Sequence, residues 1–221
     1  MLDSQMIQML AEGTIESIYM TVAITVISYI IGIPLGVFLV ISDKNGIRPM
    51  SGLNWLVGGI VNILRSVPFL IMMITIQPLT RMIVGTTIGT RAAIVALVVS
   101  AAPFVARMVE QSLLEIDHGV IEAAQSMGAS NTQIITKVLL PESKPSLLNG
   151  ALVSATTILG YSAMAGFIGG GGLGDIAIRY GYNRYDTGTM LITVVLLVIL
   201  VQIIQSVGSR IAKRSDKRIN D

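Results

Sequence analysis

The sequence contains no cysteine and little charge. The absence of cysteine from the 221 residues excludes a disulfide framework, a thiolate metal site and a cysteine nucleophile. Only 13% of the residues are charged, and a net charge of +2 without a stripe of basic and aromatic residues argues against nucleic acid as a partner. Hydrophobic residues make up 52% of the chain, and the mean hydropathy is +0.75. This balance predicts a protein that lies in a lipid bilayer.

The motifs of several enzyme classes are absent or incomplete. No G-x-x-x-x-G-K-[ST] loop occurs, so the chain lacks the usual phosphate-binding loop, and energy for any transport would have to come from an ATPase partner or from an ion gradient. There is no H-E-x-x-H, and the single histidine, His118, is expected at a helix entry in a solvated loop rather than as a metal ligand. The glycines at 169, 171 and 174 fit a dinucleotide pattern formally, but Val194 stands where an acidic residue is needed, so we expect a tight turn at residues 169–174 instead. We therefore expect no catalytic residue, no metal site and no cofactor.

Two functions of membrane proteins, intramembrane proteolysis and ion-driven transport, are considered as alternatives. A G-L-G-D run ending at Asp175 and a Y-D pair ending at Asp186 imitate intramembrane aspartyl proteases. Two carboxylates that share a proton lie about 3 Å apart in a protected site, whereas both aspartates are expected in one loop beside Arg179 and Arg184. An ion-driven carrier is also disfavoured, because the uncharged runs leave no acidic residue at membrane depth. Both stay as weaker alternatives.

Long apolar runs predict five transmembrane helices. Each run reaches the roughly 20 residues needed to cross the hydrocarbon core. The spans are expected near residues 15–42, 60–80, 88–108, 147–168 and 187–209. Arg65 fits either a helix end, where its side chain reaches the headgroups, or a polar interface between helices. The predicted fold class is therefore all-α, a polytopic membrane protein in which residues 1–221 form a single transmembrane domain.

The ends of the first span and the loops determine the expected orientation. The first 12 residues are acidic and lack the basic region of a cleaved signal peptide, so the first span is expected to stay in the mature protein. Basic residues are retained on the cytoplasmic side of membranes. A cytoplasmic tail puts there Arg210, Lys213, Arg214, Lys217 and Arg218 together with Lys44, Arg48, Arg107, Lys137 and Lys144, and leaves outside only Arg81, Arg91, Arg179 and Arg184. The sequence therefore predicts an external N-terminus, a cytoplasmic C-terminus and a cytoplasmic segment between residues 107 and 145.

Small and polar residues within the spans indicate which helix faces meet protein. Gly32 and Gly36 form a G-x-x-x-G pair, which favours close helix packing over a role in a pore. The fourth span carries hydroxyl groups and a thioether where alanine would be enough for packing, and here packing and a substrate pathway remain equally open. The candidate pathway residues are Thr157, Tyr161, Ser162 and Met164.

The polar segment from residue 117 to residue 141 predicts two short helices. Asp117 can cap a first helix that runs to Met127, and Gly128 has the permissive backbone that commonly follows a helix C-terminus. Ala123 and Ala124 add almost no bulk to this helix, which would allow it to enter a cleft on another protein.

The second short helix is predicted from its own start and stop signals. Ser130 and Gln133 have the spacing of a capping box, and apolar residues then recur every three or four positions. Pro141 is expected to end the helix.

The same segment resembles a known signature. Glu122-Ala123-Ala124, Gly128 and the run Val138-Leu139-Leu140-Pro141 are similar to the E-A-A-x3-G-x9-I-x-L-P pattern of ABC importer permeases, with valine in place of the usual isoleucine. In that family the segment is the cytoplasmic helix that docks onto the ATPase subunit. The resemblance implies an ATPase-coupling role for Glu122, Ala123, Ala124, Met127, Gly128 and Pro141.

Other stretches of the chain resemble one particular group of ABC importer permeases. The stretches 65–69, 101–110, 160–164 and 170–174 are similar to the permeases of D/L-methionine importers, across nearly all of the chain. This implies a type I ABC importer permease fold in the bacterial inner membrane, a multi-pass homodimer bound to membrane lipid, two cytoplasmic ATPase subunits and an external substrate-binding lipoprotein. The implied substrate is methionine, while related permeases leave another small amino acid or a small peptide open.

Overall fold

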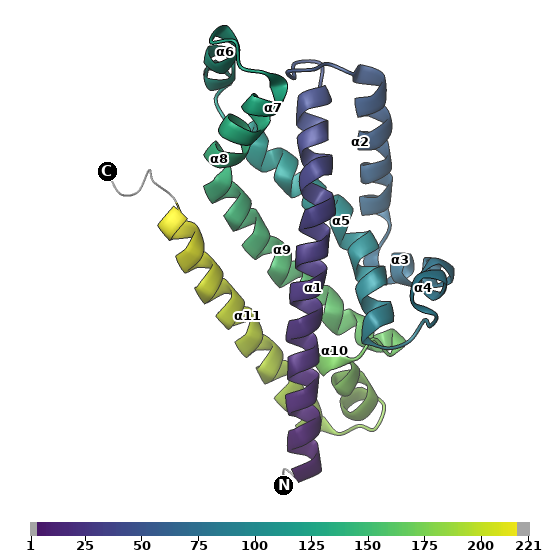
Figure 1. Ribbon diagram of the computed structural model, residues 1–221. Coiled ribbons are helices and arrows are strands. Elements are labelled where there is room, and N and C mark those ends of the chain that lie inside the picture. Colours follow the sequence, from purple (N-terminus) through teal and green to yellow (C-terminus); the bar gives the residue numbers. More distant parts are fainter. Residues whose placement is uncertain (1–3, 216–221) are drawn as a thin grey trace. The chain divides into compact units, whose positions relative to one another are not determined.

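The computed structural model describes residues 4–215, and within that range the chain is helical with no strand (Figure 1). Lys217 and Arg218, which contributed to the predicted orientation, lie outside the described residues. The long helices are α1 (Ser4–Ser42), α2 (Ser51–Ser66), α5 (Thr90–Leu114), α9 (Lys144–Met164) and α11 (Thr187–Ser215). The shorter ones are α3 (Phe69–Thr75), α4 (Gln77–Val84), α6 (His118–Ser126), α7 (Asn131–Gln133), α8 (Leu140–Glu142) and α10 (Gly172–Ile176), with π-helices η1 (Ile134–Leu139) and η3 (Ala177–Tyr182) and the 3-10 helix η2 (Ala165–Ile168).

Four helices are long and apolar enough to cross a membrane, and a bent pair of helices brings the number to five. The four are α1, α5, α9 with its extension η2, and α11, and the bent pair is α2 with α3 at an angle of 103°. The all-helical polytopic fold is therefore confirmed.

The second span, predicted near residues 60–80, is not one continuous helix, because the chain breaks at Val67 and Pro68. Proline has no N–H to donate and disfavours helical backbone in the residue before it. Arg65 lies exposed in the last turn of α2, which agrees with the helix-end alternative.

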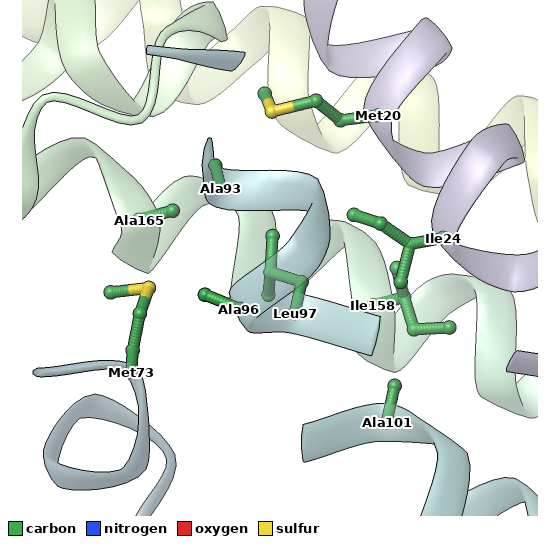
Figure 2. Packing of buried hydrophobic residues seen from close by; sticks show 9 residues of the cluster. All are labelled: Met20, Ile24, Met73, Ala93, Ala96, Leu97, Ala101, Ile158 and Ala165. Atoms are coloured by element: carbon green, nitrogen blue, oxygen red, sulfur yellow. The ribbon is translucent and has the colours of Figure 1, made fainter. Parts of the chain in front are cut away.

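The described chain forms two compact units, and each of the helices α1, α5, α9 and α11 contributes to both. The first unit contains residues 4–27, 67–101 and 154–206. Its core includes Met20 and Ile24 from α1, Leu97 from α5 and Ile158 from α9, which Figure 2 shows gathered together. A further cluster in this unit includes Leu10, Leu159, Leu173, Ile176 and Leu200.

The second unit contains residues 28–66, 102–153 and 207–215, and in it α1 lies directly against α5. A Cβ atom added at Gly32 would lie 2.6 Å from Cγ1 of Val105, and one added at Gly36 would lie 2.7 Å from the carbonyl oxygen of Ala106. The predicted packing role of the G-x-x-x-G pair is confirmed, since only glycine leaves room for this approach.

Polar side chains attach α2 to its neighbours in the second unit. The amide of Asn54 donates to the carbonyl of Leu39 at 2.7 Å, which joins α2 to α1. The guanidinium of Arg107 donates to the carbonyl of Gly58 at 3.1 Å and forms an ion pair with Glu110 at 2.6 Å. Partly buried charges are retained where they are paired and hydrogen-bonded, so Arg107 joins α2 to α5 in this part of the span.

Candidate functional site

The first helix of the 117–141 segment begins as the sequence predicted and ends at Ser126, one residue before the predicted Met127, which is its C-cap. The Asp117 carboxylate accepts the Gly119 N–H at 2.7 Å and caps α6, of which His118 is the first residue. Gly128 follows the helix with φ of +78°, the left-handed region that side chains other than hydrogen rarely occupy. A cap at each end gives this exposed helix fixed limits.

The second helix begins as predicted but does not end at Pro141. Ser130 and Gln133 form the capping box, with the Ser130 N–H donating to the Gln133 side chain at 2.8 Å. The chain then forms the π-helix η1, and Pro141 lies in the first turn of α8, which leads into α9. The prediction of a stop was wrong, because proline is tolerated in a first helical turn, where its missing N–H is not needed.

The two alanines of α6 have different surroundings. Ala124 is 5% exposed and packs in a cluster with Ile134 and Leu139. Ala123 is exposed, as are Glu122, Met127 and Gly128, and the Met127 side chain is 82% exposed. Only one alanine of the predicted pair is therefore available to a partner, while the other attaches α6 to its own chain.

The candidate pathway residues lie in the other unit, on the second half of α9. Tyr161 is half-buried, and its ring is stacked on Phe69 from α3, with centroids 4.3 Å apart. Ser162 is buried, and its hydroxyl donates to the carbonyl of Leu159 at 2.8 Å. Thr157 is half-buried, whereas the side chain of Met164 is 49% exposed. Tyr161 and Met164 are thus more accessible than Ser162, and Phe69 is a neighbour that the sequence alone did not suggest.

The glycine-rich stretch after α9 forms the predicted tight turn. The backbone of Gly169, Gly171 and Gly172 has positive φ angles between +72° and +82°. The N–H of Gly172 donates to Oε2 of Glu16 at 2.8 Å, and the N–H of Leu173 donates to Oγ of Ser17 at 2.9 Å. These contacts with α1 join residues 156 positions apart, and no local pattern in the sequence indicated them.

The two aspartates of the protease-like pattern have separate partners. Asp175 forms an ion pair with Arg179 at 2.9 Å. Asp186 precedes α11 and accepts the hydroxyl of Thr189 at 2.6 Å and the N–H of Gly188 at 3.0 Å. The Thr189 hydroxyl, followed by the Thr189 and Gly188 backbone N–H groups, lowers the pKa of Asp186. Helix capping and a local ion pair explain both residues without a shared proton.

Known proteins resemble this chain over nearly its full length. The family described as "Binding-protein-dependent transport system inner membrane component" matches residues 32–221. A probable D-methionine transport system permease protein, MetI of Vibrio cholerae, is 52% identical and is covered over 93% of its length by 95% of this chain. The methionine import system permease protein MetP of Bacillus subtilis is 44% identical, with 81% of each chain covered. A solved structure of the MetNI methionine ABC transporter in inward-facing conformations matches with a TM-score of 0.96 and 47% identity, over 97% of this chain and 100% of that one.

Proposed function

The chain belongs to the family of inner membrane components of binding-protein-dependent transport systems, and we propose that it is the permease subunit of an ABC importer for methionine. The observation that carries the proposal is the agreement over 97% of this chain with a chain of the MetNI methionine ABC transporter, at 47% identity. Relatives named for methionine transport in Vibrio and Bacillus support the same substrate.

The proposed assembly is a homodimer of this chain with two cytoplasmic ATPase subunits and an external binding protein. The chain has no phosphate-binding loop of its own, so ATP hydrolysis would take place on the ATPase subunits. The distribution of basic residues supports an orientation in which α6 faces the cytoplasm and the N-terminus faces outside.

The proposed contact with the ATPase is the exposed face of α6. Ala123 and Gly128 are exposed and small, Glu122 and Met127 lie beside them, and Ala124 packs inward against the chain. A force applied to this face would pass through Ala124 to Ile134 and Leu139, the buried residues of η1 that precede α9. The ATPase would therefore act on the spans through packed side chains rather than through a flexible loop. Pro141, in the first turn of α8, lies on this route into α9.

The proposed pathway follows α9 between two copies of the chain. Tyr161 and Met164 offer an aromatic ring and a polarizable thioether, and both suit the thioether of methionine. Thr157 and Ser162 lie on the same helix, and the buried Ser162 would contribute to the shape of the wall rather than to binding. ATP binding and hydrolysis would move the two copies between states open to either side.

Reconstitution of the chain into vesicles with its ATPase and binding protein tests this function. Radiolabelled methionine should accumulate only with ATP, and a panel of other amino acids should stimulate hydrolysis less. Stimulation by a different amino acid would reject methionine as the substrate. Uptake that needs no ATP but follows an ion gradient would reject the ABC importer altogether.

A further inference from the structure

Four residues on one face of α1 receive the glycine turn that follows α9. Gly13, Glu16, Ser17 and Met20 recur at intervals of three and four positions, which places them in one row along the helix. A Cβ atom at Gly13 would clash with the Ile176 side chain in α10. We call this row of four residues the seat of the turn. Its small residue, Gly13, lies where α10 crosses α1.

The turn has no room for side chains at its contact with the seat. A Cβ atom added at Gly172 would lie 2.7 Å from Oγ of Ser17 and 2.8 Å from Cε of Met20. One added at Gly171 would lie 2.9 Å from Oε2 of Glu16. Both glycines also have positive φ, a backbone conformation that favours glycine, and without side chains they allow α1 to approach closely.

Two side chains of α1 hold this backbone by accepting its N–H groups. We call the pair of hydrogen bonds from Gly172 to Glu16 and from Leu173 to Ser17 the clasp. The Ser17 side chain is buried, whereas Glu16 is exposed. A carboxylate forms a strong bond to an N–H group, and an exposed side chain has room to move away from its partner when the groups separate. The clasp therefore combines one buried bond, from Leu173 to Ser17, with one more accessible bond, from Gly172 to Glu16.

The same turn also contacts the beginning of α5. The N–H of Gly89 donates to the carbonyl of Gly169 at 2.9 Å, directly before α5 begins at Thr90. Since the turn follows η2 and α9, it joins the end of the proposed pathway helix to α1 and to α5 within one compact unit. Movement of this end of α9 relative to α1 or α5 requires these bonds to change.

We propose that Glu16 and Ser17 are positioning residues for transport, and that their clasp on Gly172 and Leu173 stabilises the state closed to the outside. This inference rests on the proposed function. It concerns how the proposed pathway is kept closed to the outside and adds no further substrate. The chain matches a transporter solved in inward-facing conformations, and we therefore assign the clasp to the state in which the outer side is closed. Opening to the outside separates the turn from the seat, and the strength of the clasp sets how often this happens without substrate.

The test measures ATP hydrolysis by the reconstituted transporter without methionine or binding protein. Glu16→Ala removes the acceptor, and hydrolysis without substrate should rise about tenfold, as expected from the loss of one hydrogen bond to a charged group. Glu16→Gln keeps an oxygen acceptor and should rise less. Glu12→Ala is the matched control, because Glu12 lies one turn away on α1 and accepts a hydrogen bond from the side chain of Gln8 on the same helix, at 2.9 Å. It should leave hydrolysis unchanged.

Ser17→Ala provides a second test in case Glu16→Ala does not fold, and it too should raise hydrolysis without substrate. Equal hydrolysis by Glu16→Ala and Glu12→Ala would overturn the proposal. A proportional fall of hydrolysis and uptake with a lower melting temperature would also overturn it, because that result indicates a purely structural role. Failure of the wild-type vesicles to take up methionine would instead reject the proposed substrate, since the comparison of hydrolysis rates does not depend on the transported molecule.

Discussion

The rings of Phe69 and Tyr161 are stacked almost parallel, with centroids 4.3 Å apart and an angle of 4° between their planes. Phe69 begins α3, directly after the break in the second span, and Tyr161 lies on the proposed pathway helix α9. The stack therefore fixes a candidate pathway side chain against the shorter part of the bent pair.

Replacement of Phe69 by leucine should weaken this contact. An aromatic pair contributes about 1 kcal/mol beyond the burial of its area, so Phe69→Leu should lower the melting temperature slightly and reduce methionine uptake severalfold. Tyr161→Phe keeps the stack and serves as the control, with uptake close to that of the wild type. If Phe69→Leu transports as well as Tyr161→Phe does, the stack does not position the pathway.

The two alanines of α6 permit a matched pair of substitutions. Ala124→Leu inserts a larger side chain into a packed cluster and should destabilise the protein by about 1–3 kcal/mol, measured as thermal unfolding in detergent. Ala123→Leu adds the same atoms to an exposed position and should leave the melting temperature unchanged while preventing copurification of the ATPase subunit. Retention of the ATPase by Ala123→Leu would contradict the proposed docking face.

The left-handed backbone at Gly128 predicts that coupling to the ATPase depends on which residue occupies this position. Apart from Gly128 and its two chain neighbours, no atom lies within 4 Å of a Cβ built at this position, so the φ of +78° is what opposes a side chain. Gly128→Val should cost about 1–2 kcal/mol of local strain and abolish ATPase stimulation, with normal insertion into the membrane. Gly128→Asn should retain most activity, because asparagine tolerates this region better. Normal uptake by the valine variant would exclude a role for this turn in coupling.

The cap of α11 predicts a loss of stability in acid. The folded protein holds the Asp186 pKa below its ordinary value of 3.8 through the Thr189 hydroxyl, so the native state binds fewer protons than the unfolded state. The stabilisation is complete above that ordinary value and is lost as the pH falls through the lower, folded pKa. Asp186→Ala should therefore lower the melting temperature at pH 7 and reduce its dependence on pH below about 4. An unchanged acid dependence in this variant would show that the cap does not contribute.

The sequence was sufficient for features that neighbouring residues decide. The capping by Asp117 and the Ser130–Gln133 box were predicted because a capping side chain accepts a hydrogen bond from a backbone N–H only two or three positions away. The pairing of Gly32 and Gly36 with another helix was predicted because small residues at this spacing leave a groove. Which helix would fill that groove was not predicted.

Other features depended on contacts between distant parts of the chain. The break near Pro68 was missed because hydropathy is high on both sides of it, so the average over the window conceals the bend. The different surroundings of Ala123 and Ala124 depend on the π-helix η1, which the helical period of the sequence does not distinguish from an ordinary helix. The partners of Glu16 and Ser17 lie 156 positions away, beyond any local pattern.

The close approach of α1 to α5 at Gly32 and Gly36 has a mechanical consequence. Since backbone meets side chain there without a gap, neither a lipid tail nor water has space to enter between the two helices. When the thickness or lateral pressure of the bilayer changes, α1 and α5 should tilt together as one element. Only 11% of the most apolar stretch of α11 is buried, so α11 should be the helix that changes its tilt to match the surrounding lipid.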